Sequence, residues 1–255
     1  MSRRSAIAGL LLLSCAGIAT SRTPELTIGQ TVTGPSATPG PQKLGDHAFF
    51  YRPAKPSTAR RPLIVLFHGA GQSARAMIDG TRAEADRCGC LLVAVQSKGA
   101  TWDTIGLVRD AARAERATPA ELFGEDAGRV ERALSAALSA ADADRRSVVL
   151  FGFSDGASYA LSLGLANPSL VRGVVAIAPG FHLEPAAINP KQRLFVAHSP
   201  ADRVLPFRRT RDDTVASLRR AGFDLSFRPF DGGHRIDRTV LAEGLDFVLD
   251  RRTAS

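Results

Sequence analysis

Hydrophobic residues along the chain form short continuous runs that alternate with longer stretches of helical spacing. The continuous runs are typical of strands buried on both faces of a sheet, since no alternation with polar residues interrupts them. We expect strands over residues 48–51, 63–67, 91–95, 147–151, 174–178, 194–197 and 223–229. We expect helices over residues 73–87, 126–141, 155–166, 208–221 and 236–250.

This order of elements predicts the fold class. Strands that alternate with helices form a mostly parallel sheet with helices on both faces. The chain has 255 residues and a hydrophobic content of 44%, enough to bury one sizeable core. We therefore expect a single α/β domain over residues 46–255. Short connections after the helix at 155–166 leave no room for a large lid, and only the long connection 96–125 has the length to cover a site partly.

The N-terminus is typical of an export signal rather than of the folded domain. Two arginines precede an apolar stretch over residues 6–13 that is too short to span a bilayer, so residues 1–20 are interpreted as the signal. The four residues ending at Cys15 resemble a lipobox, in which Cys15 would become the lipidated first residue of an envelope-anchored protein. Cleavage near Ala19 would instead release a periplasmic or secreted protein. Both alternatives stay open.

Residues 21–45 are rich in Pro, Thr, Ser and Gly and have almost no aliphatic periodicity. Such a composition cannot bury a core, so we expect a flexible spacer between the signal and the domain.

The formal net charge of +8 raises the question of a nucleic-acid partner. The basic residues are mostly arginines spread along the chain, and no basic run is interleaved with aromatic residues as a binding surface would need. We expect an arginine-rich solvated surface and no nucleic-acid partner.

Cys88 and Cys90 flank a single glycine. Export would permit a disulfide, but a ring closed across one residue is very tight. No further Cys or His lies at zinc-ligand spacing. We expect two structural, partly buried cysteines at a helix-to-strand turn, with their oxidation state left open.

A candidate nucleophile follows the strand at 147–151. The sequence Gly-Phe-Ser-Asp-Gly over residues 152–156 matches G-x-S-x-G, and it lies between an apolar strand and a helix, where this motif holds a serine on a sharp turn. Ser154 is therefore the candidate nucleophile. The backbone N–H of Asp155 would point at a developing oxyanion from the helix N-terminus. The alternative is a plain turn with Ser154 as helix N-cap.

A serine hydroxyl needs a base, and the base needs an acid to orient it. His234 lies in a glycine-rich loop after the last strand, at the carboxyl edge of the sheet where sites of this fold class gather. Asp202 is the only carboxylate in the loop 198–206. Asp231 is the alternative acid, although its place three residues before His234 suits a loop-capping group better.

The loop 68–72, after the strand at 63–67, is expected to supply a second oxyanion donor. It reads His-Gly-Ala-Gly-Gln, and its small residues let backbone N–H groups approach a substrate oxygen. We expect the Ala70 amide in this role, with Gly71 as the alternative, and a structural role for His68. Trp102, at the same edge, either lines an acyl or aromatic pocket or packs its loop onto the domain.

Five motifs together carry a family resemblance: His-Gly-Ala-Gly-Gln, Gly-Phe-Ser-Asp-Gly-Ala, Ala-Pro-Gly-Phe, His-Ser-Pro-Ala-Asp-Arg-Val-Leu-Pro and Asp-Gly-Gly-His. In this order they resemble the carboxylesterase branch of the α/β-hydrolase superfamily, namely phospholipase/carboxylesterases and the polyhydroxybutyrate-depolymerase and feruloyl-esterase-like proteins. The resemblance implies ester hydrolysis without metal or organic cofactor, with Ser154, Asp202 and His234 at the triad positions. One departure is Ser199, where the family usually has glycine.

The expected function is therefore that of a serine esterase forming an acyl-enzyme on Ser154. An open site without a large lid suits small soluble or polymeric esters. Two alternatives stay open: a peptidase or amidase of the same fold, and a non-catalytic surface lipoprotein that binds a ligand.

Overall fold

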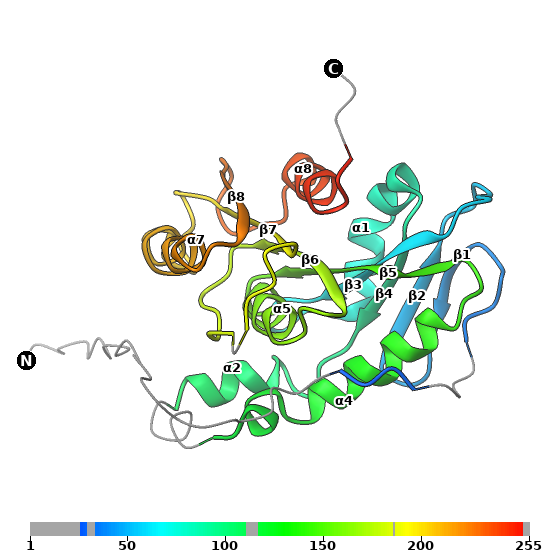
Figure 1. Cartoon of the computed structure of the whole chain (residues 1–255), viewed down its shortest axis with the longest axis horizontal. Helices are drawn as coiled ribbons and strands as arrows, with labels where there is room; N and C mark the ends of the chain where they lie inside the picture. The colour runs from blue at the N-terminus through cyan, green and yellow to red at the C-terminus, as the bar shows by residue number, and fades with distance from the viewer. Residues whose placement is uncertain (1–25, 30–33, 111–116, 186, 252–255) are drawn as a thin grey trace, which may run out of the picture.

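The computed structural model describes residues 26–29, 34–110, 117–185 and 187–251. Within these ranges, one eight-stranded sheet forms the centre of the molecule, in the order β1-β2-β4-β3-β5-β6-β7-β8 (Figure 1). The strands β3 to β8 are mutually parallel, whereas β2 pairs antiparallel with both β1 and β4. The strands are β1 (Gly40–Lys43), β2 (Ala48–Arg52), β3 (Arg61–Phe67), β4 (Leu91–Val95), β5 (Ala143–Phe153), β6 (Val171–Ile177), β7 (Arg193–His198) and β8 (Asp224–Pro229).

Helices cover both faces of this sheet (Figure 1). Side chains of α1 and α8 share one apolar core with one face of the sheet, and side chains of α2, α4, α5 and α7 share a second core with the other face. The helical segments are α1 (Ala74–Cys88), α2 (Asp103–Val108), α4 (Pro119–Leu138), α5 (Asp155–Ala166), α6 (Phe207–Arg209), η1 (Thr210–Val215), α7 (Ala216–Arg220) and α8 (Arg238–Val248).

The central strand β3 shows why a continuous apolar run is needed. Leu63, Val65 and Phe67 belong to one core, and Ile64 and Leu66 belong to the other. Successive side chains of a strand point to opposite faces, so a strand with a helical layer on each side must be apolar at every position. The predicted architecture, a mostly parallel sheet with helices on both faces, is confirmed, and no large lid is inserted in the described part of the chain.

The boundaries of several elements differ from the expectations. The strand expected over 147–151 extends over Ala143–Phe153, and the helix expected over 126–141 is α4, which begins at Pro119 and is kinked at Gly124 with φ 53°. The helix expected over 208–221 is divided into α6, a π-helical turn and α7. Periodicity located these elements but did not reveal the kink or the π turn.

Within the range 21–45, the expectation of a flexible spacer is wrong for the four residues of β1. Gly40–Lys43 forms β1, which adds to the edge of the sheet with Pro41 opposite Tyr51. Proline is tolerated on an edge strand because it needs no ladder donor there, so its presence did not exclude a strand. Further upstream, Leu26 is buried, and its N–H donates to Asn167 Oδ1 at 2.7 Å.

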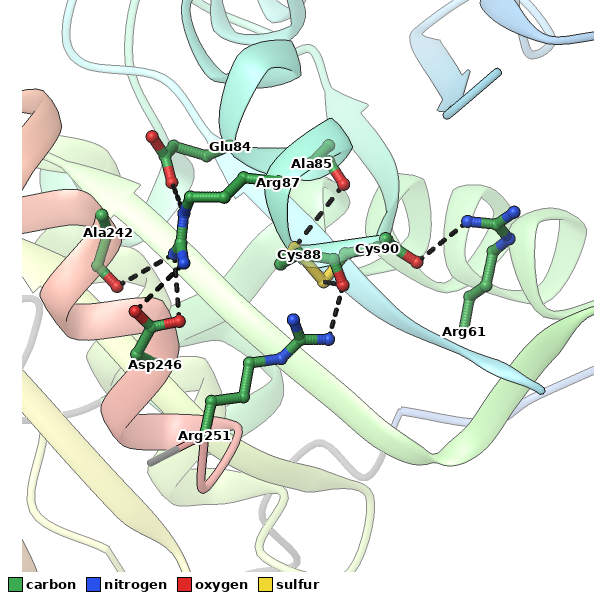
Figure 2. The surroundings of a disulfide bond; sticks show 10 residues. Arg61, Glu84, Ala85, Arg87, Cys88, Cys90, Ala242, Asp246 and Arg251 are labelled. Carbon is green, nitrogen blue, oxygen red and sulfur yellow. Dashed lines mark hydrogen bonds and ion pairs between the residues drawn. A yellow bond between two sulfur atoms is a disulfide. The ribbon is translucent and has the colours of Figure 1, made fainter. Parts of the chain in front are cut away.

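Cys88 and Cys90 form a disulfide, and both residues are buried (Figure 2). The expectation of partly buried residues was therefore wrong in degree, and the oxidation state that the sequence left open is that of a bonded pair. Gly89 has φ 62°, the left-handed conformation that ends α1, and the two cysteine Cα atoms lie 5.3 Å apart, within the usual range for a disulfide. Arg61 donates to the Gly89 carbonyl and Arg251 to the Cys88 carbonyl, which fixes the turn from both sides.

Candidate active site

Ser154 lies on the turn between β5 and α5, with φ 57° and ψ −123°. A positive φ is strained for a residue with a side chain, and such strain is typical of functional turns. The flanking glycines are required sterically: a Cβ on Gly156 would lie 2.2 Å from the carbonyl oxygen of Phe67, and one on Gly152 would lie 2.1 Å from that of Gly156. The Ser154 side chain makes no cap hydrogen bond to α5, so the alternative of a plain N-cap is wrong.

The structure brings Ser154, His234 and Asp202 together. His234 Nδ1–H donates to Asp202 Oδ2 at 2.6 Å, which leaves Nε2 as the acceptor for the Ser154 hydroxyl at 2.9 Å. The ring of Phe153 packs against the imidazole, with ring centroids 4.9 Å apart. The alternative acid, Asp231, is exposed, and the described hydrogen bonds of His234 go to Asp202 and Ser154 instead.

Asp202 is held by its own loop as well as by His234. Its Oδ1 accepts the backbone N–H groups of Val204 and Leu205, at 2.7 and 2.9 Å, and its side chain is fully buried. Burial raises the pKa of this carboxyl, but the hydrogen bonds from His234 and from the two amides outweigh burial and hold the pKa below its usual range. Asp202 is therefore ionised at neutral pH and can stabilise a protonated His234.

Ser199, the departure from the family pattern, connects the acid loop to the base loop. Its side chain is buried, and its Oγ accepts the N–H of Gly233 at 3.0 Å and that of Ala201 at 3.2 Å. Gly233 directly precedes His234, so this hydroxyl fixes the backbone that carries the imidazole. The sequence alone gave no sign of this contact, because the partner lies 34 residues away.

The loop after β3 lies beside the nucleophile. A Cβ built on Gly69 would lie 3.3 Å from Ser154 Cβ. The Gly71 N–H donates to the carbonyl of Ala100 at 2.7 Å, so the alternative oxyanion donor is already used. Among the hydrogen bonds described, the Ala70 amide has no acceptor and is available to a ligand.

Asp155 supplies the second available amide. It is the first residue of α5, where a backbone N–H has no intrahelical partner. Its carboxylate turns away to accept the Thr101 hydroxyl at 2.7 Å, and Arg109 lies 3.7 Å from the same oxygen. The N–H of Asp155 and the positive end of the helix dipole therefore lie next to Ser154.

His68 has the structural role expected for it. The ring is buried; its Nε2 accepts the Ser97 N–H at 3.2 Å, so Nδ1 carries the hydrogen and donates to the Gly69 carbonyl at 2.8 Å. Burial lowers the pKa of His68, against the opposing effect of the Gly69 hydrogen bond. A neutral imidazole thus supports the loop that carries the Ala70 amide.

The prediction that Trp102 lines a substrate pocket is wrong. Its side chain is 0% exposed and has no surface to offer a substrate. The indole N–H donates to the His68 carbonyl at 2.9 Å, and the ring stacks on Tyr159 with centroids 4.6 Å apart. Trp102 therefore packs its loop onto the domain and supports the loop after β3. The sequence also indicates that Thr101 lies at this edge but predicts no role for it; its hydroxyl donates to Asp155.

Two further expectations concern metal binding and the N-terminus. In the part of the chain that the structure describes, no three His, Cys, Asp or Glu side chains are grouped so as to hold a metal ion. Cys15, the candidate lipidation site, and the expected signal at 1–20 lie outside the described residues.

The order of the sheet, the strained turn at Ser154 and the hydrogen bonds that link Asp202, His234 and Ser154 together define a protein of the α/β-hydrolase class. Residues 52–249 match the model of the phospholipase/carboxylesterase family. The chain belongs to this family, whose members are hydrolases with esterase activity. No curated protein matches the sequence.

Solved structures share the fold. A carboxylesterase from Mesorhizobium loti is 21% identical, with a TM-score of 0.56 over 80% of this chain and 96% of its own. A phospholipase/carboxylesterase from Dyadobacter fermentans is 17% identical, with a TM-score of 0.55 over 84% of this chain and 100% of its own. A thermostable esterase is 17% identical, with a TM-score of 0.58 over 80% of this chain. The present chain covers only 58% of that protein's length. At these identities the likeness concerns the fold alone.

Proposed function

We propose that the protein is a serine esterase that hydrolyses carboxylic esters through an acyl-enzyme on Ser154. One observation carries the proposal: an unbroken series of hydrogen bonds runs from the buried Asp202 through His234 to the Ser154 hydroxyl. Its geometry is within the range that proton transfer to a base requires. Family membership supports the ester as the substrate class.

In the first step, Ser154 Oγ bonds to the ester carbonyl carbon and its proton passes to His234 Nε2. The carbonyl oxygen becomes an oxyanion, which the Ala70 and Asp155 amides hold. Asp202 stabilises the imidazolium that forms and keeps Nδ1 protonated. The bond to the alcohol oxygen then breaks, and the alcohol leaves with the proton from Nε2.

In the second step, water replaces the alcohol. His234 takes a proton from the water as its oxygen attacks the acyl carbon, and the same two amides hold the second oxyanion. The bond to Ser154 Oγ breaks, Oγ regains the proton from Nε2, and the carboxylic acid is released.

The test is the replacement of Ser154 by alanine. We expect Ser154→Ala to lower kcat for a nitrophenyl ester by several orders of magnitude, about 10⁴-fold or more, because the relay acts as a unit. The matched control is Ser169→Ala, an exposed serine, which should keep the parental rate. Parental hydrolysis by Ser154→Ala would refute the mechanism.

Two further measurements separate the alternatives. A peptidase or amidase of the same fold would cleave a matched amide as fast as the ester, whereas an esterase prefers the ester. A non-catalytic binding protein would not react at Ser154 with a fluorophosphonate. Labelling that is present in the parent and absent in Ser154→Ala would exclude that alternative.

We also propose that the protein is exported, on the basis of the charged and apolar pattern of residues 1–20. In the described residues, no helix combines the length and apolar character needed to cross a bilayer. To test export and lipidation, the full chain and its Cys15→Ala variant are each expressed in cells supplied with a radiolabelled fatty acid. Label in the parent alone indicates a lipid anchor; unlabelled protein outside the inner membrane indicates free release. Retention of both proteins in the cytoplasm contradicts export.

A further inference from the structure

A second imidazole contacts the acid of the relay. His198 ends β7, four residues before Asp202, and its side chain is fully buried. Its Nε2 lies 3.0 Å from Asp202 Oδ2, the same oxygen that accepts His234 Nδ1–H at 2.6 Å. One carboxylate oxygen therefore lies between two histidines, only one of which touches Ser154.

The neighbours of His198 determine where its proton lies. Nε2 is also 3.2 Å from the carbonyl oxygen of Leu205, so both groups that face this nitrogen are acceptors only. Nε2 must therefore carry a hydrogen and donate it to the carboxylate. On the other side of the ring, Nδ1 lies 2.6 Å from the Thr210 hydroxyl, whose single hydrogen is directed either at the Pro179 carbonyl, 2.7 Å away, or at Nδ1. In both arrangements Nε2 carries the hydrogen that Asp202 accepts.

His198 completes the hydrogen bonding of Asp202. A carboxylate has about four acceptor positions, and here two amides occupy Oδ1 while two imidazoles occupy Oδ2. Rotation of the carboxyl group would break all four bonds, so Oδ2 stays aimed at His234. The bond from His198 also draws on the negative charge of Oδ2, which weakens the attraction of that oxygen for a protonated His234.

We propose that His198 is a positioning residue, which acts through Asp202 to fix the orientation of His234 and to limit how strongly its protonated form is stabilised. The proposal rests on the proposed function, because His234 must act as the base. The Ser199 hydroxyl fixes the base loop separately, through the Gly233 amide.

The groups around His198 allow its effect to be isolated. In the described part of the chain, the charged or titratable groups that act on the ring are Asp202, from its own loop, and His234, from the loop after β8. The α6 and η1 segments contribute the Phe207 ring, 5.9 Å from the imidazole between centroids, and the Thr210 hydroxyl. Burial is the largest influence on the pKa of His198 and lowers it, against the opposing effect of Asp202.

Two variants test the proposal. His198→Phe keeps a ring but removes the donor to Asp202; we expect kcat to fall about tenfold with KM within about twofold of the parent, because a hydrogen bond to a charged group is lost. The acid limb of the kcat/KM profile should move to higher pH by about half a unit, since the uncompensated carboxylate favours the protonated base. His198→Gln keeps an N–H near the position of Nε2 and should restore the parental acid limb.

A parental kcat and pH profile in His198→Phe would overturn the proposal. An equal fall in kcat in both variants, without a shift of the acid limb, would also overturn it, since this is the result of a structural role alone. If a variant does not fold, nitrogen NMR of the histidine-labelled parent protein provides an independent test. We expect His198 to carry its hydrogen on Nε2 at pH 7, and a ring protonated only on Nδ1 contradicts the proposal.

Fluorophosphonate labelling of the parent at Ser154 separates this inference from the function on which it rests. If Ser154 is not labelled and Ser154→Ala keeps the parental rate, the proposed function fails. If Ser154 is labelled but His198→Phe behaves as the parent, only the role of His198 fails.

Discussion

Gly156 is a point of close contact between helix α5 and the end of strand β3. A methyl group at this position would lie 2.2 Å from the carbonyl oxygen of Phe67 and 2.5 Å from that of His68. Both atoms belong to the backbone, so no side chain can rotate away. Gly156→Ala therefore forces the distance to Phe67 from 2.2 to at least 3.0 Å, a separation of helix and strand by 0.8 Å or more.

This separation moves the nucleophile away from the loop that carries the Ala70 amide. A misplacement of about 1 Å can cost about 10²-fold in rate, and forcing an extra methyl group into a packed contact costs about 1–3 kcal/mol. We expect Gly156→Ala to lower kcat/KM for a nitrophenyl ester by about two orders of magnitude and to lower the free energy of unfolding in urea by about 1–3 kcal/mol.

Gly80→Ala is the matched control. Gly80 is an exposed helical residue of α1, and a Cβ there meets no atom within 4 Å. The control should keep parental kcat/KM and gain about 0.5–1 kcal/mol in stability, because alanine restricts the unfolded chain and favours the helix. Parental activity and stability in Gly156→Ala would refute the steric reasoning.

Two further predictions concern the base loop and the buried histidines. Ser199→Ala removes the acceptor for the Gly233 amide. We expect the free energy of unfolding in urea to fall by about 1–2 kcal/mol and kcat to fall severalfold. An unchanged kcat would show that this hydrogen bond is not needed to position His234. His47, His68 and His198 all have a pKa lowered by burial, so the unfolded chain binds protons more readily than the native state below about pH 6.5. The stability they contribute is present above that pH and is lost as the pH falls towards their lowered native values. The melting temperature should fall between pH 7.5 and 5, and a constant value would contradict this assignment.

The main parts of the site were predictable from the sequence because they depend on order along the chain. A serine between a buried strand and a helix, an acid after a later strand and a histidine after the last strand must all lie at the carboxyl edge of a parallel sheet. The structure brings Ser154, Asp202 and His234 together as this order requires. Continuous apolar runs such as residues 63–67 located the central strands for the same physical reason.

The remaining features depend on contacts that the sequence does not encode locally. The Gly71 amide donates to the carbonyl of Ala100, which lies far from it in the sequence, and no local pattern predicts this contact. The burial of Trp102 was decided by its contact with Tyr159, and an apolar ring in a loop has no sequence signal that separates a pocket wall from a packed anchor. The sequence does not show which strand lies at the edge of the sheet, where a proline is tolerated. Pro41 therefore wrongly favoured a segment without strand structure.

The topology of the sheet determines when activity first exists during synthesis of the chain. The loop after β3 and Ser154 after β5 are made early, but His234 follows β8, which joins the sheet at its far edge through β7. A ribosome-bound chain that has folded its N-terminal strands therefore carries a serine without a proton acceptor. Under the proposed mechanism, the enzyme becomes competent only when its last strand docks, so partly made or truncated chains cannot attack esters around them.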